Sequence, residues 1–222
     1  MGVLSRAATG TGSMSKETQI RILSVDDHPL LREGLAAMIE NQPDMLLVAQ
    51  ASNAQEAVQQ FRKHRPDITL MDLRLPDRSG IDATVAVRAE FPEARVIVLT
   101  TFEGDVEIKR ALQAGARGYI LKSMPAKELM EAIRQVHAGK KLIPPQVAAH
   151  LAEHLGDEAL TEREIAVLNE IAKGNRNRDI AEKLSITEET VKVHIKHIMD
   201  KLGANDRTQA VSIGLRRGII AL

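Results

Sequence analysis

The chain has 222 residues, of which 44% are hydrophobic and 27% are charged, so it can build one large or two modest folded domains and is not a disordered protein. The absence of cysteine excludes disulfides, thiolate metal sites and a cysteine nucleophile. Thirty Lys and Arg residues balance thirty Asp and Glu residues, and no stretch is apolar over the length of a membrane span, so we expect a cytoplasmic protein with no membrane partner.

Residues 1–19 are set apart by their composition. They are rich in Gly, Ser, Thr and Ala and show no apolar periodicity. Gly12, Ser13 and Met14 look like the junction between a leader or expression tag and a second start. We therefore expect this segment to be disordered and to lie outside the fold.

Residues 20–138 alternate between strand-like and helix-like segments. Short runs rich in β-branched or aliphatic residues predict strands at Ile20–Val25, Met45–Ala51, Asp67–Met71, Ala94–Leu99 and Gly118–Leu121. Apolar residues at helical spacing predict helices at Pro29–Glu40, Ala54–Lys63, Ile81–Glu90, Val106–Ala114 and Ala126–Ala138. Because parallel neighbours need helical crossovers, the alternation predicts a five-stranded parallel sheet covered on both faces, a doubly wound α/β fold.

The stretch Ile68–Gly80 contains the first candidate for a chemical role. Its apolar run ends at Asp72, and Pro76 and Gly80 then force the chain to turn. Open α/β sheets bind ligands at the carboxyl ends of their strands, so Asp72 is placed for chemistry. Taken alone, an Asp after a strand is more often a turn former or a helix cap, and the decision therefore depends on the other strand ends.

Those other strand ends carry further polar residues. The first predicted strand ends at Asp26 and Asp27, the fourth at Thr100 and the fifth at Lys122. In a parallel sheet these residues share one edge with Asp72, where carboxylates repel one another unless a cation lies among them. Lys122 supplies one positive charge, and oxygen ligands favour Mg²⁺, or alternatively Mn²⁺, over zinc.

Such a site suits phosphoryl transfer. A metal ion and Lys122 would neutralise oxygens of an incoming phosphoryl group, Thr100 would offer a hydroxyl, and the Asp72 carboxylate would attack in line. The product would be an acyl phosphate on Asp72. We expect the neighbouring His28 to begin the first helix and not to bind the ion, because an oxygen-ligated magnesium site has no need of imidazole.

Taken together, residues 20–138 resemble a response-regulator receiver domain, which has a flavodoxin-like fold. The resemblance is carried by the acidic pair Asp26 and Asp27, by Asp72 with its Leu-Arg-Leu-Pro-Asp-Arg-Ser-Gly tail, by Thr100, and by the run Gly118–Lys122. It implies that a sensor histidine kinase phosphorylates the acceptor aspartate. The implied site comprises Asp27 and Asp72 as direct Mg²⁺ ligands, Asp26 acting through water, the backbone carbonyl of Arg74, and the switch pair Thr100 and Tyr119.

A linker is predicted over residues 139–156. Gly139 ends the preceding helix, and Pro144 and Pro145 are expected to block regular structure. The segment Val147–Leu155 could form a short amphipathic helix.

Residues 157–222 are predicted to form a small all-α domain of four helices. Thr161 and Glu164 match a capping box at the start of the first helix, which ends at Gly174. Two short helices joined by a tight turn would then make a helix-turn-helix unit. The remaining helices are expected at Arg178–Leu184, from Thr187 onward, and at about Arg207–Arg217.

The third helix of this domain has two distinct faces. Its buried stripe is expected to comprise Val191, Ile195, Ile198 and Leu202. Lys192, Val193 and Lys196 project elsewhere, and two lysines one turn apart beside an exposed valine would suit a DNA major groove. The alternative is an ordinary solvated face, because eleven basic and eleven acidic residues from Asp157 onward give no strong basic signal.

The domain resembles the LuxR-type helix-turn-helix of NarL/FixJ response regulators. The matching segments are Leu160–Glu164, Asn177–Ala181, Thr190–Lys196 and Arg207–Ala210. The resemblance implies that Lys192, Val193 and Lys196 contact the bases and backbone of double-stranded promoter DNA, with Thr190 and Arg178 as phosphate contacts. It also implies a homodimer in the phosphorylated state, formed on DNA through the fourth helix. Asn175 and Arg176 depart from the family pattern, in which an apolar residue often follows the glycine, and this leaves the packing of the turn open.

Two other hypotheses use the same acidic residues. A magnesium phosphatase or phosphotransferase could form an aspartyl phosphate, but haloacid-dehalogenase-type enzymes usually carry a second Asp two residues after the nucleophile, where this chain has Arg74. A regulator that no longer responds to phosphorylation would not need the intact acidic site. We therefore interpret the chain as a bacterial two-component transcription regulator that catalyses only its own phosphoryl transfer and dephosphorylation.

Overall fold

The N-terminal half of the computed structural model contains the predicted parallel sheet. The model describes residues 19–101, 104–154 and 156–220, so the expected disorder of residues 1–18 lies outside the described residues. All strand pairs are parallel and their order is β2-β1-β3-β4-β5. The strands are β1 (Ile20–Val25), β2 (Met45–Ala51), β3 (Ile68–Met71), β4 (Val96–Thr100) and β5 (Gly118–Leu121).

Helices cover both faces of this sheet, as predicted. One apolar layer packs the sheet against α1 and α5 around Ile22, Ile39 and Ile133. The opposite layer packs α2 and α3 around Leu23, Phe61 and Val87, and α4 joins the same side. The five helices are α1 (Pro29–Glu40), α2 (Ala54–His64), α3 (Gly80–Glu90), α4 (Asp105–Gln113) and α5 (Ala126–His137).

Local hydrogen bonds explain the small differences from the predicted boundaries. The fourth strand was predicted to begin at Ala94. The Ala94 amide instead donates to the Phe91 carbonyl at 2.9 Å in a turn, and β4 begins at Val96. The third helix begins one residue early, at Gly80, because the Ser79 hydroxyl caps its first turn by accepting from the Ile81 amide.

The predicted linker is more ordered than expected. The Tyr119 amide donates to the Leu142 carbonyl at 3.0 Å, so the chain after α5 continues the sheet edge beside β5. Pro145 does not block a helix, since it occupies the first turn of α6 (Pro145–Glu153), where a missing amide hydrogen costs nothing. This helix begins before the predicted Val147, whose side chain is buried against the receiver, and the predicted end at Leu155 lies outside the described residues.

The C-terminal part contains the four predicted helices. Thr161 and Glu164 form the expected capping box at the start of the first of them. Val167, Leu168, Ile180 and Val191 are fully buried in the shared core. Ser185 adopts a left-handed conformation (φ 53°) in the turn between the second and third helices. The helices are α7 (Glu162–Ala172), α8 (Asn177–Leu184), α9 (Glu188–Leu202) and α10 (Arg207–Arg216).

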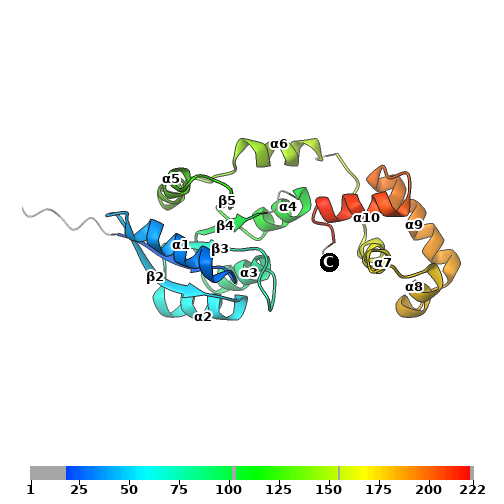
Figure 1. The fold of residues 1–222 in the computed structure, drawn as a ribbon, viewed down its shortest axis with the longest axis horizontal. Coiled ribbons are helices and arrows are strands. Elements are labelled where there is room, and N and C mark those ends of the chain that lie inside the picture. Colours follow the sequence, from blue (N-terminus) through cyan, green and yellow to red (C-terminus); the bar gives the residue numbers. More distant parts are fainter. Residues whose placement is uncertain (1–18, 102–103, 155, 221–222) are drawn as a thin grey trace, which may run out of the picture.

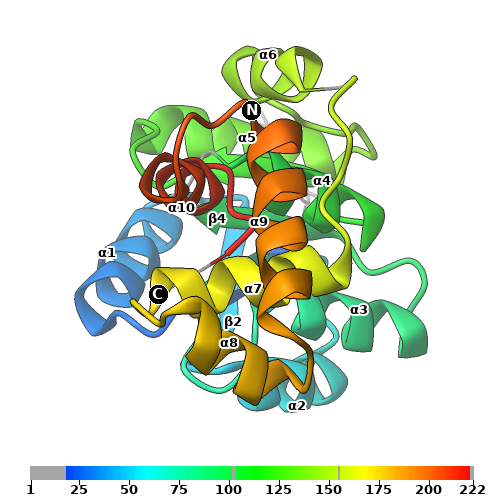
Figure 2. The same cartoon turned by 90° about the vertical axis from the view of Figure 1, so that its right-hand side faces the viewer.

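The two parts lie side by side, with α4 and α10 facing each other between them (Figure 1). Helix α6 lies above the place where α4 and α10 face each other. Helices α7 to α10 form the effector part, and α9 lies on its side that is away from the sheet. Figure 2 views the molecule from that end, with α9 crossing in front of α7. Among the described residues, no helix has the length and apolar character needed to cross a membrane.

Candidate functional site

The ends of neighbouring strands bring four predicted site residues to one edge of the sheet. Asp26 follows β1, Asp72 follows β3, Lys122 follows β5, and Thr100 is the last residue of β4. The Asp72 amide donates to the Val25 carbonyl at 2.9 Å, and the Lys122 amide donates to the Thr100 carbonyl at 2.7 Å. Backbone pairing therefore sets the positions of these residues, while their chemical roles stay predictions.

Lys122 lies between two buried carboxylates. Its Nζ is 2.6 Å from Oδ2 of Asp26 and 2.9 Å from Oδ2 of Asp72, and all three side chains are at most 6% exposed. Burial alone would lower the pKa of Lys122, but its bonds to the two carboxylates raise that pKa above its usual value. The lysine is therefore a fixed positive charge beside Asp72.

The charge at this edge is nevertheless negative overall. Burial raises the pKa of Asp72 above its usual value, although the bond from Lys122 and a hydrogen bond from the Arg74 backbone amide act in the opposite direction. The neighbouring charge of Asp26 raises it further. Because Asp27 adds another carboxylate beside this pair, a single lysine does not neutralise the cluster.

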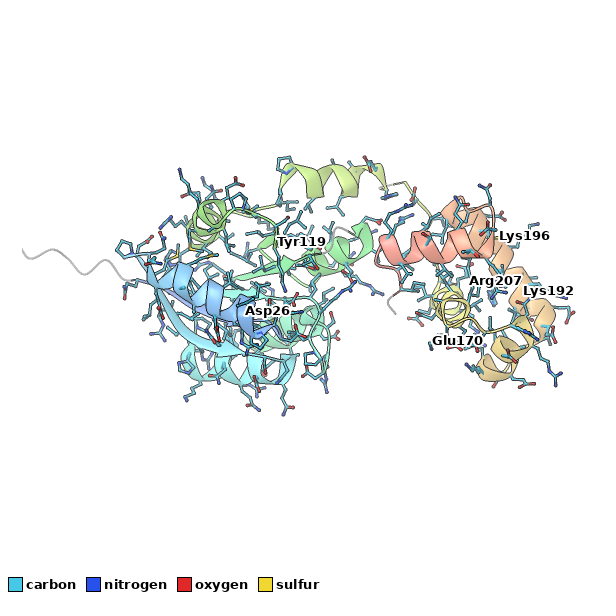
Figure 3. All side chains as sticks on the ribbon, viewed as in Figure 1. Asp26, Tyr119, Glu170, Lys192, Lys196 and Arg207 are labelled. Carbon is cyan, nitrogen blue, oxygen red and sulfur yellow. The ribbon has the colours of Figure 1, made fainter. Side chains whose placement is uncertain are left out.

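The donor set of this cluster fits a divalent cation. Asp26, Asp27, His28 and Asp72 each place a ligand atom within 4.8 Å of the others. Hard cations such as Mg²⁺ prefer oxygen ligands, and an ion here would relieve the repulsion among the carboxylates. His28 is the N-cap residue of α1, as expected, and its Nδ1 also lies 2.7 Å from Oδ1 of Asp27. Figure 3 labels Asp26 beside α1.

The predicted switch residues are buried on adjacent strands. Thr100 is 1% exposed, and Tyr119 is fully buried in β5, paired in register with Val98. The Tyr119 ring packs with Ile108 of α4 and Val147 of α6, on the side that α6 covers in Figure 3. Its inward position therefore connects the sheet to α4 and to the segment that leads into the effector part.

A contact between the two parts was not predicted from the sequence. The guanidinium of Arg217, just after α10, donates to both carboxylate oxygens of Asp105 at 3.0 and 2.9 Å. Arg217 also contacts Asp157 at 2.7 Å, and its carbonyl accepts from the Val106 amide at 3.2 Å. Asp105 and Arg217 are 112 residues apart, and no short motif links them. The contact matters because Asp105 begins α4, the helix that follows the Thr100 strand.

The predicted DNA-contacting side chains are exposed on α9. Two residues of its expected buried stripe, Val191 and Ile198, are fully buried. The other two, Ile195 and Leu202, are half-buried against the same core, while Val193 is 51% exposed. Lys192 and Lys196 point away from the receiver part in Figure 3. Within the described ranges, the receiver part therefore leaves this face of α9 uncovered.

The two predicted phosphate contacts differ in how they are held. The Thr190 hydroxyl lies 2.9 Å from the Thr187 hydroxyl, which caps the start of α9. The Arg178 side chain is 78% exposed and reaches Glu182 at 3.4 Å. Thr190 is therefore part of a helix cap, whereas Arg178 is an exposed charge on the surface of α8.

A polar network holds the turn after α7, where Asn175 and Arg176 depart from the family pattern. The carboxylate of Glu170 accepts from Lys173 at 2.6 Å, from the side-chain amide of Asn175 at 2.8 Å and from Lys183 at 2.9 Å. Arg207 donates to the Asn175 carbonyl at 2.9 Å, and Glu170 and Arg207 are both labelled in Figure 3. Hydrogen bonds therefore hold this turn, in the place of apolar packing.

Comparisons with known proteins agree with both halves of this arrangement. Residues 22–134 match the response regulator receiver domain, and residues 158–213 match the bacterial regulatory proteins of the luxR family. The transcriptional regulatory protein LnrK of Bacillus subtilis is 38% identical over 216 residues, which span 90% of this chain and 98% of that protein. The response regulator protein VraR of Staphylococcus aureus is 37% identical over 206 residues, covering 90% of this chain and 99% of VraR.

A solved structure is similar to nearly the whole of this chain. The response regulator ChrA, described as part of a heme-sensing two-component system, is 34% identical, with a TM-score of 0.55 over 91% of this chain and 99% of ChrA. The predicted receiver fold and the predicted helical DNA-binding domain are both confirmed by these matches and by the strand order. The chain therefore belongs to the response regulators of the LuxR (NarL/FixJ) type, and it is a transcriptional regulator that joins a receiver domain to a DNA-binding domain.

Proposed function

We propose that phosphorylation of Asp72 by a sensor histidine kinase controls how tightly this regulator binds double-stranded promoter DNA. The observation that carries the proposal is the placement of Lys122 between Asp26 and Asp72, at 2.6 and 2.9 Å. A buried nucleophile with a fixed positive charge and a surplus of carboxylates beside it is the arrangement that phosphoryl transfer requires.

In the proposed reaction, a carboxylate oxygen of Asp72 attacks the phosphorus of a phosphohistidine on the kinase. The new O–P bond forms as the P–N bond breaks, and the released imidazole nitrogen takes up a proton. Lys122 stays protonated and stabilises the phosphoryl oxygens, and Thr100 offers its hydroxyl to another of them. Asp26, Asp27, Asp72 and the carbonyl of Arg74 would hold Mg²⁺, or Mn²⁺, whose charge would neutralise the phosphoryl group.

The contact between α4 and the effector part supports a route from Asp72 to DNA binding. A phosphoryl group adds about two negative charges and draws Thr100 and Lys122 toward it. A shift of α4 that followed would weaken the bidentate contact between Asp105 and Arg217 and would release the effector part to form a homodimer on DNA. These events would take place in the bacterial cytoplasm.

The size of the switch sets how complete it can be. Moving a population from mostly inactive to mostly active needs about 5 kcal/mol of differential stabilisation. We therefore expect measurable DNA binding before phosphorylation, with an increase on phosphorylation. Apart from transfer to its own aspartate and the later hydrolysis of that acyl phosphate, we propose no catalytic activity.

The test compares DNA affinity and molecular mass with and without a small phosphodonor and Mg²⁺. Wild type should gain affinity or dimer fraction, and Asp72→Ala should gain neither. Asp82→Ala is the matched control, because Asp82 is an exposed carboxylate in the first turn of α3. Equal donor responses in wild type and Asp72→Ala would reject the proposal, and steady turnover of a small phosphate ester would favour an enzyme.

A further inference from the structure

The loop that follows Asp72 is closed tightly at its base. The Gly80 amide donates to the Leu73 carbonyl at 2.9 Å, and Arg74 pairs with Ser79 in an antiparallel bridge. A Cβ atom at Gly80 would lie only 1.9 Å from the carbonyl oxygen of Asp72, so glycine is what lets the loop close. The residues between Arg74 and Ser79 form the tip of this loop.

The tip is fastened to a different part of the receiver by Asp77. One carboxylate oxygen of Asp77 accepts from the Ala54 amide at 2.8 Å and the other from the Gln55 amide at 3.0 Å. These amides belong to the first two residues of α2, and Asn53 caps the next free amide, that of Glu56, at 2.8 Å. Helix starts leave such amides without partners inside the helix, and α2 takes two of its partners from the Asp72 loop.

The start of α2 is in turn attached to the other side of the acidic site. The Asp26 amide donates to the Ala51 carbonyl at 3.1 Å, and Ala51 ends the strand that precedes α2. The short connection between them is held by the Glu56 carboxylate, which accepts from the Ser52 amide at 2.8 Å. The backbone that positions Asp26 is thus continuous with the backbone that Asp77 grips.

The same loop reaches the acceptor carboxylate directly. The Arg74 backbone amide donates a hydrogen bond to the Asp72 side chain. Two points of this loop are therefore fixed. Its start contacts the Asp72 carboxylate, and its tip is bonded to α2, which follows the strand that pairs with Asp26. The two hydrogen bonds accepted by Asp77 join the tip to the start of α2.

We propose that Asp77 is a positioning residue for the phosphorylation site. By joining the Asp72 loop to α2, it holds the carboxylates of Asp26 and Asp72 at the separation that a divalent cation and an incoming phosphoryl group need. Asp77 itself is exposed and does not touch the reacting atoms. The inference rests on the proposed phosphorylation of Asp72 and adds a residue that controls the geometry of that site.

The experiment measures Mg²⁺ binding to the full-length chain by calorimetry and its phosphorylation rate with a small phosphodonor. Asp77→Ala should weaken Mg²⁺ binding by about 3- to 10-fold, below the effect of losing a direct partner of a metal ligand. The phosphorylation rate at low Mg²⁺ should fall by a similar factor and recover at saturating Mg²⁺. Asp77→Asn, which keeps one acceptor oxygen, should fall between Asp77→Ala and wild type.

Asp82→Ala is again the control, because it removes an exposed carboxylate close to Asp77 in the groove between α2 and α3. It should leave Mg²⁺ binding unchanged. If Asp77→Ala lowers the thermal midpoint in EDTA but binds Mg²⁺ as wild type does, Asp77 is only a cap of α2 and the inference is wrong. If wild type itself binds no Mg²⁺ and accepts no phosphoryl group, the proposed function fails first, so the two failures are distinguishable.

Discussion

Two buried carboxylates, Asp72 in the receiver and Glu164 in the effector part, have pKa values shifted in opposite directions. In the receiver, burial raises the pKa of Asp72, and Lys122 is shared between Asp72 and Asp26. In the effector, burial would raise the pKa of Glu164, but the Thr161 amide and Lys201 together lower it below its usual value. Glu164 is only 4% exposed and has Lys201 at 3.0 Å, so its charge is matched.

This difference is what the proposed function predicts for a reactive carboxylate and a structural one. A carboxylate whose negative charge is destabilised by burial and by a neighbouring carboxylate gains from a bound cation, which offsets that charge. A carboxylate with a satisfied charge stabilises the helix it caps and has nothing to gain from chemistry.

Removal of Lys122 should produce the largest change. Lys122→Met keeps the length of an unbranched side chain but removes the cation between the buried Asp26 and Asp72 carboxylates. Loss of one partner from a buried ion pair typically lowers the free energy of unfolding by about 3–5 kcal/mol. Urea unfolding followed by circular dichroism at pH 7 in EDTA would measure the loss. Mg²⁺ should restore part of it. Lys122→Ala should abolish the donor-dependent gain in DNA affinity, and a variant that still switched normally would contradict the proposed role.

Glu164→Gln should have the next largest effect, and its pH dependence should identify the cause. Loss of the charged bonds to the Thr161 amide and Lys201 should lower the free energy of unfolding by about 1–2 kcal/mol at pH 7. Because the folded pKa of Glu164 lies below the unfolded value, this stability is present above the unfolded pKa and lost as pH falls through the folded pKa. The gap between wild type and variant should therefore close in acid, whereas a constant gap would indicate a packing defect.

Local patterns explain why most of the two folds was predictable. The capping box at Thr161 and the alternation of strands and helices act over a few residues, so they are visible in the sequence. Because parallel strands end at one edge, the positions of Asp26 and Asp72 followed from the topology alone. The contact of Arg217 with Asp105 and that of Asp77 with α2 depend on tertiary packing across long separations, and no periodicity or spacing encodes them.

Asp72→Asn should stabilise the metal-free protein. A raised folded pKa means that the ionised carboxylate opposes folding at neutral pH, and this penalty disappears as pH falls through that pKa. The variant should exceed wild type by on the order of 1 kcal/mol in EDTA at pH 7, and the two should converge in acid. Saturating Mg²⁺ should reverse their order, because the ion stabilises only the carboxylate cluster of wild type. A destabilised Asp72→Asn in EDTA would show that Asp72 is structural, like Glu164.

Glu170→Gln should have the smallest effect, and salt should distinguish it from Glu164→Gln. Side-chain bonds from Lys173 and Lys183 lower the pKa of Glu170, but these lysines are 62% and 52% exposed, so water and ions screen them. A fall of about 1 °C in the thermal midpoint is expected, shrinking further at high salt as the Debye length shortens. The Glu164→Gln effect should persist at high salt, because Lys201 is only 14% exposed. Equal salt sensitivity in the two variants would contradict this explanation. It would mean that burial of the lysine partner does not protect the ion pair from screening.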